Sequence, residues 1–80
     1  MEKSNIEIME DILVKLQDIS NSQESLIEKV GVIQVELFNH PDKELENQLN
    51  KVLTQASNLH ELIGTIIQEY EMKINNLKNA

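Results

Sequence analysis

Eighty residues form one small domain at most, and a chain without cysteine excludes disulfide bonds and thiolate metal sites. The formal net charge is -7, and all seven basic residues are lysines. Nucleic-acid interfaces and anionic membrane surfaces both attract chains rich in Lys and Arg, so we expect this protein to bind neither nucleic acid nor membrane.

The N-terminal region, residues 1–16, alternates charged and apolar side chains and has no unbroken apolar core. It therefore lacks the pattern of a signal peptide, and no apolar run in the chain reaches the length of a membrane span. We expect a cytoplasmic protein, with export by a route that needs no N-terminal signal as the alternative.

The first half of the chain carries a repeat that predicts a long helix, from about residue 4 to residue 39. Ser4 followed by Glu7 has the spacing of a capping box, which favours a helix start at this point. Apolar residues then recur in alternating steps of three and four, interrupted only by Gln23. This half of the predicted seam consists of Met9, Ile12, Leu16, Ile19, Gln23, Leu26, Val30, Ile33 and Leu37.

Two stretches of this half have another possible interpretation. Residues 20–25, SNSQES, have the composition of a loop, but the repeat keeps its phase across them, which favours a continuous helix. Residues 30–38, VGVIQVELF, are rich in β-branched side chains, yet no second strand-like run exists to pair with them. We predict helix in both.

The segment Asn39–Asp42 predicts the one break in the chain. Pro41 cannot lie inside a helix but suits the start of one, and Asn39 tolerates a left-handed C-cap. The same alternating steps then predict a second helix from about residue 42 to residue 78. Its half of the predicted seam consists of Leu45, Leu49, Val52, Ala56, Leu59, Ile63, Ile66, Tyr70, Lys73 and Leu77.

The two halves of the predicted seam match when the chain is folded about Pro41, so that paired residue numbers add to 82. We therefore predict an all-α fold, an antiparallel two-helix coiled-coil hairpin that forms a single domain over residues 1–80. One edge of this hairpin is apolar, which predicts self-association into a homodimeric four-helix bundle. The residues predicted to mediate self-association are Ile6, Leu13, Ile27, Leu53, Ile67 and Ile74.

The residues His60–Gly64 begin like the zinc-protease motif HExxH, but Gly64 replaces the second histidine ligand. We expect no metal, no cofactor and no catalytic residues, because no triad or phosphate loop is recognisable either. A better interpretation makes His60 part of a polar layer with Ser20 and Gln23 halfway along the hairpin. Such a layer fixes helix alignment at a cost in stability.

Three further apolar residues, Val32, Val35 and Phe38, lie off the predicted seam near the turn. One interpretation is scattered surface residues, which are common. The other is a binding site for an unidentified protein partner, since binding energy concentrates in a few large apolar anchors.

The chain resembles, in length, acidity and two-helix outline, the small secreted helical hairpins that carry a WxG turn motif. The turn Asn39–Asp42 contains neither Trp nor Gly, and Ile74 stands where that family has an acidic residue four positions after Tyr70. Small secretion chaperones and phage-encoded inhibitors share the outline. We expect a non-enzymatic acidic protein-binding module, such as an adaptor, chaperone or inhibitor. The alternatives are a secretion-associated hairpin and an acidic nucleic-acid mimic that blocks a basic groove.

Overall fold

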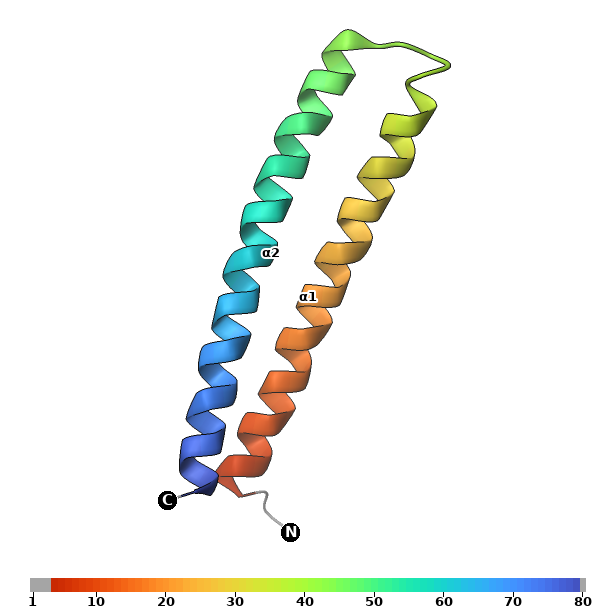
Figure 1. Cartoon of the computed structure of the whole chain (residues 1–80). Helices are drawn as coiled ribbons and strands as arrows, with labels where there is room; N and C mark the ends of the chain where they lie inside the picture. The colour runs from red at the N-terminus through yellow and green to blue at the C-terminus, as the bar shows by residue number, and fades with distance from the viewer. Residues whose placement is uncertain (1–3, 80) are drawn as a thin grey trace.

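The computed structural model describes residues 4–79, which form two long antiparallel helices joined by a short turn (Figure 1). Helix α1 spans Asn5–Glu36, and helix α2 spans Lys43–Lys78. The described residues contain no strand, and the chain measures 57 × 23 × 13 Å. The predicted all-α helical hairpin is therefore confirmed. Neither α1 nor α2 contains a segment long and apolar enough to cross a bilayer.

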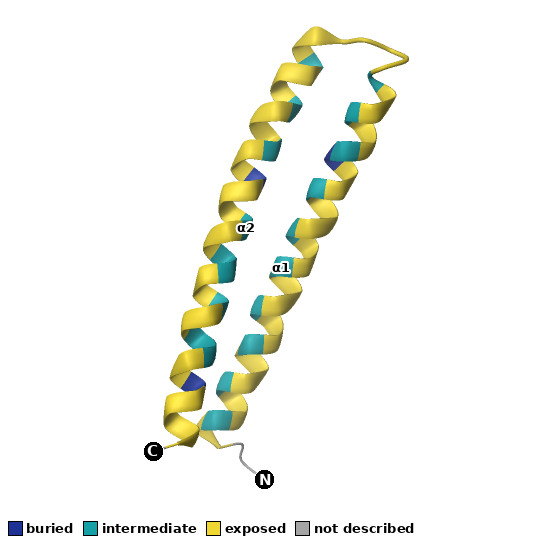
Figure 2. Ribbon diagram, in the orientation of Figure 1, coloured by how far each residue is buried: buried dark blue, intermediate teal, exposed yellow. Residues whose placement is uncertain are grey.

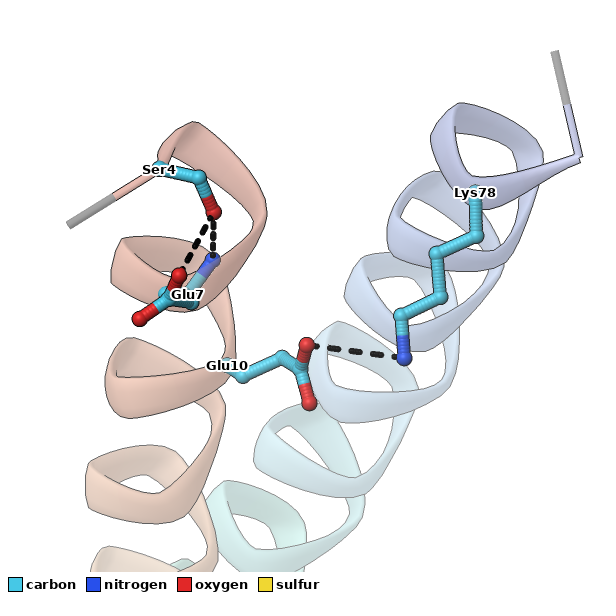
Figure 3. Close-up of polar contacts among 4 residues, drawn as sticks. All are labelled: Ser4, Glu7, Glu10 and Lys78. Atoms are coloured by element: carbon cyan, nitrogen blue, oxygen red, sulfur yellow. Dashed lines mark hydrogen bonds and ion pairs between the residues drawn. The ribbon is translucent and has the colours of Figure 1, made fainter.

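Helix α1 begins at an N-cap, where a side chain accepts a hydrogen bond from the first turn of the helix. Ser4 is the N-cap, because its Oγ accepts a hydrogen bond from the backbone N–H of Glu7 at 3.2 Å. The Ser4 hydroxyl also donates to Glu7 Oε1 at 3.2 Å (Figure 3). The helix thus begins at the cap that the sequence predicts. In a capping box the Glu7 carboxylate would accept a hydrogen bond from the backbone N–H of Ser4. Here it accepts from the Ser4 hydroxyl instead.

Helix α1 continues without a break through residues 20–25, as the unbroken phase of the repeat predicts. The β-branched stretch that follows is also helical, but α1 ends at Glu36, before the predicted end at residue 39. The N–H groups of residues 38–40 donate to the carbonyl oxygens of Val35 and Glu36 at 3.1–3.2 Å, which tightens the last turn. No described residue has a positive φ, so Asn39 does not adopt the left-handed C-cap conformation that its residue type tolerates.

Helix α2 begins immediately after the turn. Asp42 is its N-cap, with Oδ1 accepting a hydrogen bond from the backbone N–H of Leu45 at 3.1 Å. Glu44 and Glu46 lie in the first turn and Lys78 in the last, so the charges at both ends complement the helix dipole. Pro41 precedes the cap, where its missing N–H removes no helical hydrogen bond.

The two helices bury facing stripes against each other, and their outer surfaces are exposed (Figure 2). The stripe on each helix repeats every seven residues in steps of three and four, as expected for antiparallel coiled-coil packing. We call this set the observed seam. In α1 it consists of Ile6, Met9, Leu13, Leu16, Ser20, Gln23, Ile27, Val30, Gln34 and Leu37, of which Leu37 lies just past the helix end; in α2 it consists of Leu45, Leu49, Leu53, Ala56, His60, Ile63, Ile67, Tyr70 and Ile74.

The core of this hairpin is small. Only Val30, Ala56 and Ile74 among the described residues are buried, at 5%, 7% and 3% exposed. Every other member of the observed seam is half-buried. Two packed helices shield only one stripe of residues on each other. Apolar residues outside that stripe therefore remain exposed to solvent.

Candidate functional site

The residues predicted to mediate self-association lie elsewhere than expected. Ile6, Leu13, Ile27, Leu53 and Ile67 are half-buried and Ile74 is buried, all within the observed seam of one chain. Their placement on an outer edge was wrong. Those on α1 belong to a seven-residue series beside the Met9 series, and those on α2 belong to one beside the Leu49 series; the Met9 and Leu49 series are in both the predicted and the observed seam.

Each helix is rotated about its own axis relative to the prediction, so that one apolar series of the predicted seam lies outside the helix contact. These residues form an exposed apolar row along one edge of the hairpin. All seven members are between 37% and 51% exposed, and they keep the seven-residue spacing that holds them on one side of each helix. The sequence places all seven residues in the predicted seam, whereas the structure leaves them at the surface. The apolar row consists of Ile12, Ile19, Leu26 and Ile33 on α1 and Val52, Leu59 and Ile66 on α2.

Polar side chains follow the observed seam on its other edge. Gln34 Nε2 donates to Asn50 Oδ1 at 3.2 Å, and His60 Nε2 lies 3.6 Å from Glu24 Oε1. The residue numbers in each of these cross-helix pairs add to 84, against the predicted 82. Near the termini, Lys78 Nζ lies 3.5 Å from Glu10 Oε1 (Figure 3). The hairpin therefore has one polar edge, bridged by a hydrogen bond, a contact between His60 and Glu24 and an ion pair, and one apolar edge.

The polar residues predicted to form a layer are all half-buried members of the observed seam: Ser20, Gln23 and His60. Gln23 Oε1 and His60 Nδ1 are buried and have no hydrogen-bond partner within the described chain. Buried polar atoms without partners cost free energy, so this part of the seam is a weak point in an otherwise apolar contact.

The turn end of the hairpin carries the predicted partner-binding residues. Val32, Val35 and Phe38 are 61%, 63% and 84% exposed, so the intrachain contact uses none of them extensively. A pocket of about 440 Å³ lies beside the turn, and Val35, Leu37 and Phe38 contribute its apolar lining. Phe38 is the only Phe in the chain, and it is the most exposed large apolar side chain of the described residues.

Two apolar surfaces stand out on the described part of the hairpin, the apolar row and the turn end. Among residues 4–79, no three His, Asp or Glu side chains converge so that they could hold a metal ion. A scan of protein-family models and searches of curated proteins and of solved structures find no match for this chain. The apolar row and the turn end are thus the candidate functional sites, and both are apolar surfaces.

Proposed function

We propose that this protein is a small, non-enzymatic protein-binding module that acts through helix–helix association. Its first partner is a second copy of itself, so that two hairpins form a four-helix bundle. The observation that carries the proposal is the apolar row, seven Ile, Leu and Val side chains in register along one edge. Full burial of an exposed side chain of this kind contributes about 1.5–3 kcal/mol, and the row residues, at 37–51% exposed, have a part of that left to gain.

The exposed area of the hairpin is large enough to accommodate a second hairpin. Its accessible surface is 6428 Å², whereas a compact monomer of its 9.2 kDa mass exposes about 4,900 Å². The excess is about 1,500 Å², and a stable interface buries about 800 Å² on each partner. Docking of a second hairpin along the apolar row therefore needs only about half of the excess surface.

A different protein is the proposed partner for the turn end. Val32, Val35 and Phe38 lie outside both the observed seam and the apolar row, so self-association along the row leaves them accessible. An exposed Phe beside two Val residues is the kind of anchor on which binding energy concentrates. The hairpin then serves as a scaffold that presents this surface to an adaptor target, a client or an inhibited protein.

The experiment that tests self-association replaces apolar-row residues by charged ones. Ile19→Glu with Leu59→Glu places unpaired carboxylates in the interface, and we expect a monomer by sedimentation equilibrium over a range of concentrations. The control, Gln17→Glu with Ser57→Glu, makes the same change of charge on the polar edge and should leave the dimer intact. The milder pair Ile19→Ser with Leu59→Ser, followed by circular dichroism, separates dissociation from unfolding. A wild-type chain that stays monomeric at high concentration overturns the proposal.

A further inference from the structure

We propose that the two hairpins of the dimer pack with their turns at the same end of the bundle. Helix α1 of each copy then lies along α2 of its partner. This inference rests on the proposed self-association and adds its orientation. Two-fold symmetry about an axis in the interface allows only this arrangement or its opposite, in which the turns lie at opposite ends.

The apolar row by itself accepts both arrangements. With the turns together, Ile19, Leu26 and Ile33 face the partner's Ile66, Leu59 and Val52. With the turns apart, Ile12 faces the partner's Ile33, Ile19 faces the partner's Leu26, and Leu59 faces the partner's Ile66. Every one of these pairs is apolar on both sides, so hydrophobic contact does not decide the orientation.

Charges at the two margins of the apolar row do distinguish them. On α1, Lys15 and Lys29 lie four residues before Ile19 and Ile33, which places them just outside the row. On α2, Glu69 lies three residues after Ile66 on the opposite margin. The numbers of Lys15 and Glu69 add to 84, as do those of the Gln34–Asn50 and Glu24–His60 pairs, so the two lie at about the same height along the hairpin. Both are exposed, and neither forms an ion pair within the described residues.

The two arrangements bring different charges together. With the turns at the same end, Lys15 lies beside the partner's Glu69, and symmetry repeats the attraction on the other margin. With the turns at opposite ends, Lys15 lies beside the partner's Lys29, again twice. Charged groups at the rim of an interface select orientation because like charges disfavour the wrong one. The favoured bundle presents both copies of the turn, each with its Val35 and Phe38, at one end.

Spin labels measure the orientation directly, and the chain contains no cysteine of its own to interfere. Asn39→Cys puts a label in the turn, and Asn58→Cys puts one near the middle of α2; both positions are exposed. We expect label-to-label distances below about 30 Å at both sites, since neighbouring helices in a bundle lie about 10 Å apart. A short distance at residue 58 with one close to the 57 Å hairpin length at residue 39 overturns the orientation alone. No coupling at either site overturns the dimer itself.

Charge reversal gives a second readout, whose sign differs between the arrangements. We expect Lys15→Glu to raise the dimer dissociation constant about tenfold, because the new carboxylate meets the partner's Glu69, and Lys15→Glu with Glu69→Lys to restore it. The control Lys51→Glu makes the same charge change away from the apolar row and should have little effect. Tighter dimerisation of the Lys15→Glu protein, from attraction to the partner's Lys29, overturns the proposed orientation.

Discussion

Replacement of the polar layer by apolar side chains should stabilise this protein. Gln23 and His60 place buried polar atoms in the observed seam, and neither Gln23 Oε1 nor His60 Nδ1 has a hydrogen-bond partner within residues 4–79. We predict that Gln23→Leu combined with His60→Leu raises the free energy of unfolding, although the native Gln23 and His60 side chains both lie in the helix contact. Leucine has a higher helix propensity than histidine and fills the seam without polar atoms.

The magnitude follows from two opposing contributions. A buried polar atom without a partner costs about 1–3 kcal/mol, and the double substitution removes two of them. It also removes the contact between His60 and Glu24, which is worth about 1 kcal/mol or less because the Glu24 side chain is 60% exposed. The net expectation is a stabilisation of about 2 kcal/mol, which corresponds to a rise in melting temperature of about 10 °C for a chain of this size.

Urea denaturation followed by circular dichroism measures this difference. All variants must be compared at one total protein concentration, since the stability of a self-associating protein depends on concentration. The control, Gln68→Leu with His40→Leu, makes the same chemical changes at exposed positions and should alter stability by no more than about 0.5 kcal/mol. A loss of stability in the seam variant would refute the argument, because it would mean that Gln23 and His60 are satisfied in solution.

Two further predictions concern other parts of the hairpin. Gly31→Ala and Gly64→Ala should each stabilise the protein by up to about 1 kcal/mol, measured by thermal unfolding. Both glycines are helical, and a Cβ at either site meets no atom within 4 Å. Destabilisation would indicate close approach of a second chain. Val35→Ser with Phe38→Ala should preserve helix content and the dimer but reduce capture of a native partner in pull-down experiments, whereas unchanged capture would remove the turn end as a binding site.

Local signals in the sequence predicted the secondary structure of this protein well. Ser4 and Asp42 cap the two helices through side-chain oxygens, and such caps depend only on residues three positions away. Pro41 predicted the break, and the unbroken repeat predicted that residues 20–25 are helical. The early end of α1 at Glu36 was missed because the chain must leave the helix before Pro41 to reverse direction, and no single residue marks that point.

The rotation of each helix about its axis was decided only by the tertiary structure. Helix α1 has three apolar series of seven-residue spacing, headed by Ile6, Met9 and Ile12, and α2 likewise has more than one. The period of a pattern predicts that a seam exists, but it does not say whether the Ile6 series or the Ile12 series turns inward beside the Met9 series. The choice depends on how both helices fit together over their full length, a property of the pair. That choice turns Leu13 and Ile74 into the helix contact and leaves Ile19 and Leu59 at the surface, so it also determines which residues are available to a partner.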